Sequence, residues 1–221
     1  MTPELDRARG VSGELVLRRG PAGLEIVANG VFLVSAANAA SSRALVSAAW
    51  PRVRGDSLRV FIGGLGIGDA LDEALGCGRV AEVTVVELEP VVVRWFREYG
   101  GEAAGRAVEA ERAGRLRLVT ADVEDVLREP PSGWDVVALD TDNGPEWLVR
   151  DENAGLYSSD GLARVAAALR PGGVAVFWSP ERYLEFEKRL ARVFARVDVV
   201  PATDVVDGRA HDYAMFVAQG P

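Results

Sequence analysis

Residues 60–71 read VFIGGLGIGDAL, an apolar run that leads directly into a glycine-rich turn. The run begins at residue 58 and has the length and composition of a buried strand. A helix is expected after the turn, to about residue 75. Because glycine lets the backbone bend sharply and lets a ligand approach closely, the turn is a candidate binding element.

The same alternation of strand and helix continues along the chain. Further strands are predicted at residues 82–86, 115–119, 134–139, 174–178, 197–200 and 213–218. Helices are predicted at residues 89–99, 102–113, 122–128, 158–169 and 181–193. This order predicts an α/β fold with a doubly wound, mostly parallel, seven-stranded sheet. Ligands on such sheets bind beyond the carboxyl ends of the strands, so the residues that follow each strand are the candidates for a site.

The N-terminal region has a different pattern. ELVLR at residues 14–18 and LEIVANGVFLV at residues 24–34 are rich in aliphatic and β-branched residues. Asn29-Gly30 between two apolar runs is a strong hairpin signal. We expect a small antiparallel unit of two or three strands.

The division into domains follows from this change of pattern. Residues 36–49 are typical of a helix, and Pro51 ends it. We therefore expect residues 1–50 to form a small N-terminal β unit with a linking helix, and residues 51–221 to form the α/β domain.

Composition excludes several classes of protein. The chain has 33 acidic and 25 basic residues, a net charge of 25 − 33 = −8, so we expect no nucleic-acid partner and favour a cationic ligand. No apolar run approaches the roughly 20 residues of a membrane span, so no membrane partner is expected. Cys77 is the only cysteine and the chain has one histidine, which argues against a disulfide and against a metal site. These features favour a cytoplasmic location.

The spacing of the glycines limits the ligand. Gly64, Gly66 and Gly68 alternate with aliphatic residues, and Asp69 follows them. A dinucleotide turn requires G-x-G-x-x-G, so this spacing disfavours a pyrophosphate. A purely structural turn is the alternative.

Carboxylates follow the next two predicted strands. Glu87 ends the second strand, where an acid accepts hydrogen bonds from both hydroxyls of a ribose. Glu89 is expected in the first turn of the next helix, where it would complement the dipole. Asp122 follows the third strand and is equally suited to bind an adenine amine or to cap a helix.

The fourth strand ends in Asp140-Thr141-Asp142-Asn143. Asp142 and Asn143 are common turn residues. Asp140 ends an apolar run, where a carboxylate is costly unless it has a partner, so we favour a functional role for it.

These segments together resemble the class I S-adenosylmethionine fold and, within it, the polyamine aminopropyltransferases (the spermidine synthase family). The resemblance covers residues 58–176 and rests on five segments: VFIGGLGIGDAL, VTVVELEPVVV, VTADVEDVL, WDVVALDTDNGP and LYSSDGLARVAAALRPGGVAVF. It implies aminopropyl transfer from decarboxylated S-adenosylmethionine to a small cationic polyamine. The family is usually dimeric, so the resemblance also implies a homodimer.

The resemblance implies a role for each candidate residue. Asp140 is the expected catalytic base, and the expected acceptor-binding residues are Asp142, Asn143 and Tyr157. The expected residues for the nucleoside co-substrate are Gly64, Gly66, Gly68, Glu87, Asp122 and Val123. Tyr157 is also compatible with core packing.

Two alternatives remain open. A methyltransferase on the same scaffold would use S-adenosylmethionine itself and another small acceptor. A non-catalytic nucleoside-binding relative is the second alternative, because residues 34–50, VSAANAASSRALVSAAW, contain none of the Gln, Asp, Tyr or His/Glu residues that the family carries there.

Overall fold

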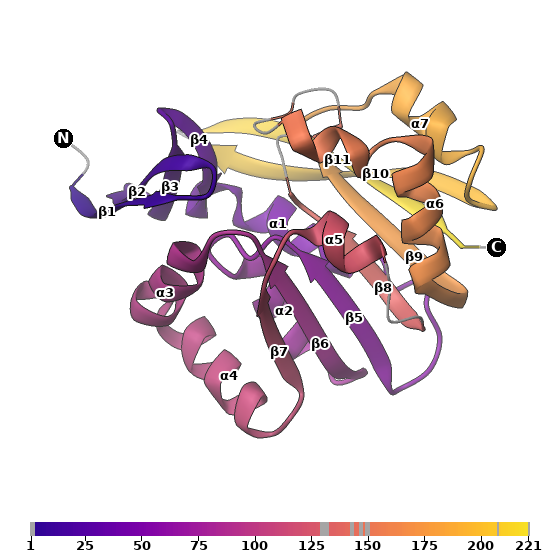
Figure 1. The fold of residues 1–221 in the computed structure, drawn as a ribbon, viewed down its shortest axis with the longest axis horizontal. Coiled ribbons are helices and arrows are strands. Elements are labelled where there is room, and N and C mark those ends of the chain that lie inside the picture. The colour runs from indigo at the N-terminus through magenta and orange to yellow at the C-terminus, as the bar shows by residue number, and fades with distance from the viewer. Residues whose placement is uncertain are drawn as a thin grey trace.

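The computed structural model describes residues 3–128, 133–141, 144–145, 148, 151–206 and 208–220, without the side chains of residues 32, 151 and 152. Figure 1 shows a large twisted sheet with helices on both faces and a small separate sheet beside the N-terminus. No helix in these ranges is long and apolar enough to cross a membrane.

The large sheet has seven strands in the order β10-β11-β9-β8-β5-β6-β7. Their bounds are β5 Leu58–Gly63, β6 Val80–Glu87, β7 Leu116–Thr120, β8 Trp134–Leu139, β9 Leu169–Ser179, β10 Arg196–Val206 and β11 Arg209–Gln219. The run from β9 to β7 is parallel, whereas β11 pairs antiparallel with both β9 and β10. The predicted fold class is therefore confirmed.

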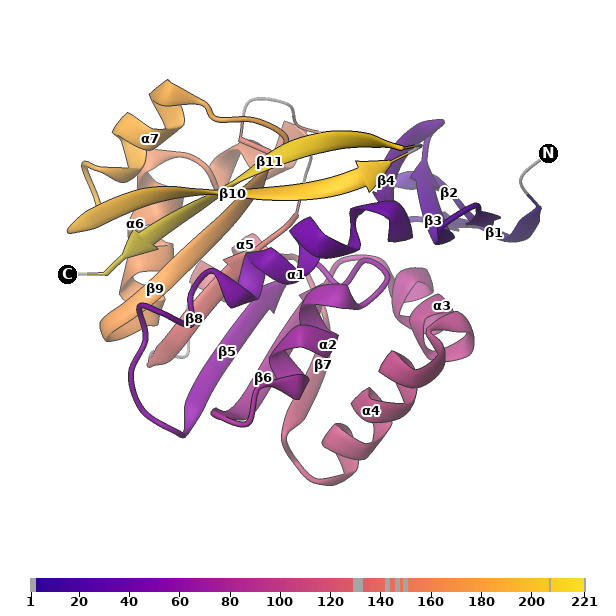
Figure 2. The same ribbon diagram turned by 180° about the vertical axis from the view of Figure 1, so that it is seen from behind.

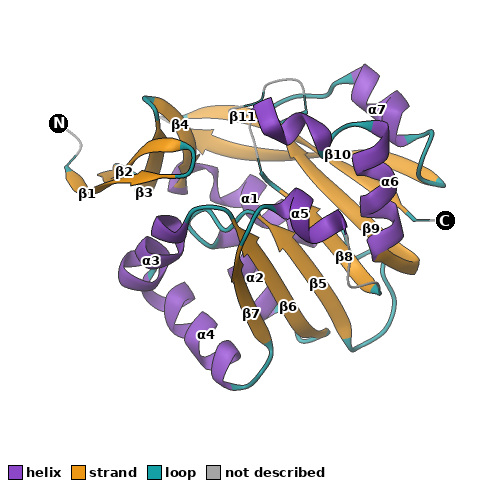
Figure 3. Ribbon diagram, viewed as in Figure 1, coloured by secondary structure: helices purple, strands orange, loops and turns teal. Residues whose placement is uncertain are grey.

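Helices cover both faces of this sheet. Their bounds are α1 Ala39–Ser47, α2 Asp69–Gly76, α3 Pro90–Tyr99, α4 Gly101–Arg112, α5 Val123–Arg128, α6 Ser159–Ala168 and α7 Leu184–Leu190, with short 3-10 turns at η1 Ala36–Asn38 and η2 Asp151–Gly155. In Figure 1, α5, α6 and α7 lie on the face turned to the viewer, and Figure 2 shows α1 and α2 on the other face. Figure 3 shows the helices in purple and the strands of the two sheets in orange.

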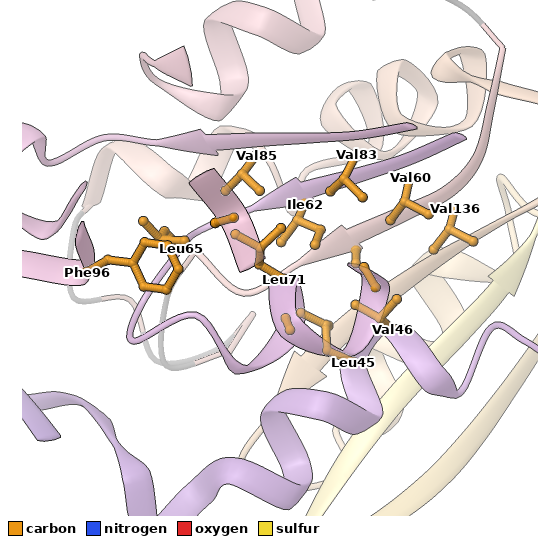
Figure 4. Packing of buried hydrophobic residues seen from close by; sticks show 14 of the residues in the cluster. Leu45, Val46, Val60, Ile62, Leu65, Leu71, Val83, Val85, Phe96 and Val136 are labelled. Carbon is orange, nitrogen blue, oxygen red and sulfur yellow. The ribbon is translucent and has the colours of Figure 1, made fainter. Parts of the chain in front are cut away.

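Alternate residues of the central strands enter different hydrophobic clusters. Val60 and Ile62 of β5 face α1 and α2, where they pack with Leu45 and Leu71 (Figure 4). Phe61, between them, packs on the opposite face with the cluster beneath α5, α6 and α7. Successive residues of a strand point to opposite faces of the sheet. Because helices cover both faces, both sets of residues are apolar, and the strand sequences are therefore continuously aliphatic.

The N-terminal region forms a four-stranded antiparallel sheet in the order β1-β2-β3-β4. Its strands are β1 Glu4–Gly10, β2 Gly13–Gly20, β3 Gly23–Ala28 and β4 Val31–Ser35. The predicted hairpin is confirmed, since Asn29 and Gly30 both have positive φ at the β3–β4 turn. The expected count of two or three strands was too low. The sequence ELDRARG of β1 is polar because β1 is an edge strand without a fully buried residue.

The last two strands are also longer than expected. The predicted segments 197–200 and 213–218 are the inner parts of β10 and β11, which have 11 residues each. Their outer parts carry Pro201 and several charges, which are tolerated because β10 is an edge strand. In Figure 2 the tip of this hairpin reaches toward β4 of the small sheet.

Candidate functional site

The candidate site lies where the chain reverses direction across the large sheet. From β5 the chain runs outward through β6 and β7, and then crosses to β8 on the other side of β5. The loops after β5 and β8 therefore diverge and open a crevice, the usual ligand position on such sheets. The backbone N–H of Asp140 donates to the carbonyl of Gly63 at 2.9 Å and holds the two loops together at its base.

Gly64 is required at this junction. Its φ of +94° is in the left-handed region, and a Cβ built on it would overlap the carbonyl oxygen of Asp140. The close approach of the two loops therefore excludes any other residue.

A cavity opens directly above these loops. Its lining comes from the residues that follow β5, β6, β7 and β8 and from the small sheet. We call it the main cavity. The predicted site residues among those that line it are Gly64, Gly66, Glu87, Asp122, Val123 and Asp140. The structure thus brings together side chains that follow four different strands.

Glu87 lies at the edge of the main cavity and is 8% exposed. One carboxylate oxygen accepts the backbone N–H of Leu65 at 2.8 Å, and the other accepts that of Glu89 at 2.8 Å. Burial raises the pKa of the Glu87 carboxyl above its ordinary value of 4.5, and the N–H groups of Glu89, Leu65 and Gly66 offset part of this rise. These three N–H groups use three of the four lone pairs of the carboxylate, so one lone pair can still accept a ribose hydroxyl.

Asp122 and Val123 border the cavity beyond β7. The Asp122 carboxylate accepts the backbone N–H of Glu124 at 2.8 Å and thereby caps α5. Capping uses one oxygen lone pair, so the two alternatives predicted for Asp122 are compatible. Val123 is buried and contributes an apolar side to the cavity.

Two predicted residues do not line the main cavity. Gly68 starts α2 in a left-handed conformation, and a Cβ there would collide with the ring of Phe96. Tyr157 is buried against Phe177 and Phe186, and its hydroxyl is 3.4 Å from the Thr141 hydroxyl. Tyr157 is thus a core residue whose hydroxyl lies next to Thr141, and Thr141 does line the cavity. Asp142 and Asn143 lie outside the described residues.

Asp140 also borders a second space, which we call the side cavity. Its described lining comes from β2, β3, β4, η1, α1, β9 and the β10–β11 hairpin. It shares Leu33, Val34, Ser42 and Asp140 with the main cavity. In the side cavity, Arg18 and the buried Glu25 form an ion pair at 2.8 Å. The rings of Trp178 and Tyr213 are 5.2 Å apart between their centroids on another side.

The main cavity contains residues that the sequence did not single out. Its outer side consists of apolar residues of the small sheet: Leu15, Ile26 and Ala28. Asp69 also lines it, half-buried beside Arg43, and burial raises the pKa of its carboxyl while Arg43 lowers it in part. Asp69 follows the glycine turn directly, a position that could have identified it. The apolar residues carry no comparable signal, since they are ordinary strand residues.

Glu89 lies at the start of α3, next to the first turn in which the sequence placed it. It occupies the N-cap position of α3, but its side chain makes no capping hydrogen bond there. Its carboxylate instead accepts the backbone N–H groups of Val11 and Ser12 in the β1–β2 turn.

Every charged side chain that lines the main cavity, within the described parts of the chain, is a carboxylate. The six are Asp69, Glu87, Glu89, Asp122, Glu124 and Asp140. Arg43 pairs with Asp69 at 3.2 Å and Arg164 pairs with Glu124 at 3.0 Å, so these two carboxylates are balanced. The lining as a whole still favours a ligand with positive charge. No group of three or more described His, Cys, Asp or Glu side chains is arranged to hold a metal ion.

Comparisons with known proteins identify the fold. No family model and no curated protein sequence matches the chain. Among solved structures, a spermidine synthase in complex with the transition-state analogue AdoDATO matches with a TM-score of 0.78 and 15% identity, over 99% of this chain and 72% of the other. The spermidine synthase from Thermotoga maritima matches with a TM-score of 0.80 and 16% identity, over 99% and 73%. The chain therefore has the spermidine synthase-like form of the class I methyltransferase fold.

Proposed function

We propose that this protein is an aminopropyltransferase that transfers the aminopropyl group of decarboxylated S-adenosylmethionine to a small cationic amine. The all-carboxylate lining of the main cavity carries the proposal. The decarboxylated co-substrate has a sulfonium and an ammonium and no carboxylate, so both of its charges are attracted there. S-adenosylmethionine adds a carboxylate, for which the described lining offers no cationic side chain.

The main cavity suits the nucleoside part of this co-substrate. Glu87 would accept a ribose hydroxyl, and Asp122 would accept the adenine amine, with Val123 against the base. The sulfonium and its aminopropyl arm would lie beside Gly64 and Gly66, which line the cavity.

Asp140 is proposed to act where the main and side cavities meet. An acceptor amine in the side cavity would give a proton to the Asp140 carboxylate. Its nitrogen lone pair would then attack the aminopropyl carbon next to sulfur. The new C–N bond forms as the C–S bond breaks, and its electron pair returns to sulfur. The sulfonium thus becomes a neutral thioether, 5′-methylthioadenosine. Alignment of the two reactants would supply most of the acceleration.

The side cavity suits a cationic, partly apolar acceptor. The faces of Trp178 and Tyr213 can contact an alkylammonium by cation–π attraction. Glu25 adds a carboxylate, but Arg18 balances its charge. Asp140 is the other carboxylate in the described lining of this cavity, and would orient the reacting amine.

Calorimetry with the two sulfonium compounds tests the proposal. Decarboxylated S-adenosylmethionine should bind at least tenfold more tightly than S-adenosylmethionine. The reverse preference would favour the methyltransferase alternative. Binding of neither compound, nor of its thioether product, would contradict both enzymatic functions.

Activity distinguishes an enzyme from a non-catalytic relative. Wild-type protein should form 5′-methylthioadenosine from the decarboxylated co-substrate and a panel of diamines and monoamines. Tight binding without turnover on any amine would support a binding role instead.

A further inference from the structure

Glu89 connects the small sheet to the main cavity. Its two carboxylate oxygens accept the backbone N–H groups of Val11, at 2.8 Å, and Ser12, at 2.6 Å. Val11 and Ser12 form the turn between β1 and β2, 78 and 77 positions away along the chain. The Glu89 side chain is buried, with the residue 3% exposed, so these bonds are sheltered from water. Hydrogen bonds of a buried carboxylate to two N–H groups are stronger than neutral ones.

The same residue also contacts Glu87 through its backbone. The Glu89 N–H donates to one Glu87 oxygen, and the Leu65 N–H donates to the other. A continuous series of hydrogen bonds therefore runs from the glycine loop through Glu87 and Glu89 to the β1–β2 turn. Ser12, Glu87 and Glu89 all line the main cavity. The position of the turn and the orientation of Glu87 are thus linked.

Gly10 fits closely against this carboxylate. A Cβ built on Gly10 would overlap Oε2 of Glu89. The turn can approach Glu89 this closely because position 10 has no side chain. The junction between turn and carboxylate therefore depends on residues from both parts of the chain.

We propose that Glu89 is a positioning residue that fastens the β1–β2 turn over the main cavity and orients Glu87 for the ribose. This role rests on the proposed function, because it assumes that a nucleoside occupies the main cavity. Glu89 acts through the turn and through Glu87, and the reacting atoms lie elsewhere.

Asp6 provides a matched control. It lies on β1 of the same small sheet, and its carboxylate accepts the Trp95 indole N–H at 2.7 Å and an Arg94 N–H at 2.8 Å, both from α3. It thus joins the same two parts of the molecule as Glu89, but it does not line the main cavity. A general loss of attachment should affect both variants, whereas a positioning role should affect only Glu89.

The experiment measures 5′-methylthioadenosine binding by calorimetry for wild type, Glu89→Ala, Glu89→Gln and Asp6→Asn. Glu89→Ala should weaken binding at least tenfold, and Glu89→Gln, which keeps one acceptor oxygen, by an intermediate factor. Asp6→Asn should change it less than twofold. In turnover, Glu89→Ala should raise KM for the co-substrate more than it lowers kcat.

Hydrogen exchange followed by mass spectrometry gives an independent readout of the turn. The amides of Val11 and Ser12 should exchange at least tenfold faster in Glu89→Ala than in wild type, and 5′-methylthioadenosine should slow them only in wild type. Gly10→Ala retains Glu89 but displaces it from the turn, so it should reproduce both effects even if Glu89→Ala does not fold.

The outcomes separate the two hypotheses. Wild-type protein that does not bind 5′-methylthioadenosine would contradict the proposed function. If wild-type protein binds 5′-methylthioadenosine and Glu89→Ala binds it with the same affinity, only the positioning role is overturned. Gly10→Ala takes the place of Glu89→Ala in this comparison if Glu89→Ala does not fold. An equal loss of affinity in Asp6→Asn would also overturn only the positioning role.

Discussion

The main and side cavities share Asp140 but are built in different ways. The core of the main cavity comes from the ends of neighbouring parallel strands, β5, β6 and β8, tied by backbone bonds such as that from Asp140 to Gly63. The side cavity joins segments that are far apart in the chain. Asn38, for example, donates to the Tyr213 hydroxyl, 175 positions away.

This difference bears on how each cavity responds to mutation. The position of the main cavity depends on the topology of the sheet. The side cavity depends on individual side chains of the small sheet and of the β10–β11 hairpin, and on Trp178 of β9.

The largest effect is expected at the residue that both cavities share. Asp140→Asn should lower kcat by about 10²–10⁴-fold, because it removes the proposed base. Binding of 5′-methylthioadenosine should change less than twofold, since the uncharged thioether does not need the base. Steady-state kinetics and calorimetry together check this. Equal losses in kcat and in thioether affinity would show that Asp140 serves the main cavity alone.

The next effect should be confined to the main cavity. Glu87→Ala should weaken nucleoside binding by more than about 1 kcal/mol, the scale of hydrogen bonds to a charged group. Glu82→Ala on the same strand is the control, since Glu82 pairs with Arg59 at the surface and lines neither cavity. An unchanged affinity in Glu87→Ala would remove Glu87 from the ribose site.

A pH titration sharpens the assignment of Glu87. The pKa of Glu87 in the folded protein is raised above its ordinary value of 4.5. Glu87 therefore contributes fully to the free energy of unfolding below pH 4.5, and this contribution is lost as the pH rises through the folded-state pKa. The ribose requires the ionised form as acceptor, so affinity should fall several-fold as the pH is lowered through the same range. Glu87→Gln should flatten this dependence and gain stability relative to wild type as the pH rises. Calorimetry and thermal unfolding across pH measure both effects.

The smallest effect is expected in the side cavity. Trp178→Ala should raise KM for the amine acceptor about threefold to fivefold, the scale of one partly exposed cation–π contact. Affinity for 5′-methylthioadenosine should stay within twofold. Trp50→Ala serves as control, because Trp50 bonds to Glu73 and lines neither cavity. A loss of thioether affinity without a change in acceptor KM would contradict the separation of the two cavities.

Local sequence signals identified several residues that line the main cavity, for a physical reason. Its glycines and acids follow strands, and parallel strands that are adjacent in a sheet end at the same edge. The exceptions are instructive. Gly68 matches the loop pattern but packs on Phe96, and Tyr157 joins the aromatic core. A pattern of residue types does not show whether a residue at the start of a helix or the end of a strand faces the cavity or the core.

The sequence alone determined the strand–helix order, the glycine turn after β5, the hairpin at Asn29-Gly30 and the acids at the strand ends, because each depends on local periodicity and on backbone conformation. Only the tertiary structure decided that β1 is a strand, that Glu89 bonds to a turn in the small sheet, and that Glu25 and Trp178 border one cavity with Asp140. These features join segments whose separation in the chain leaves no local pattern, and only the packed fold brings them within bonding distance.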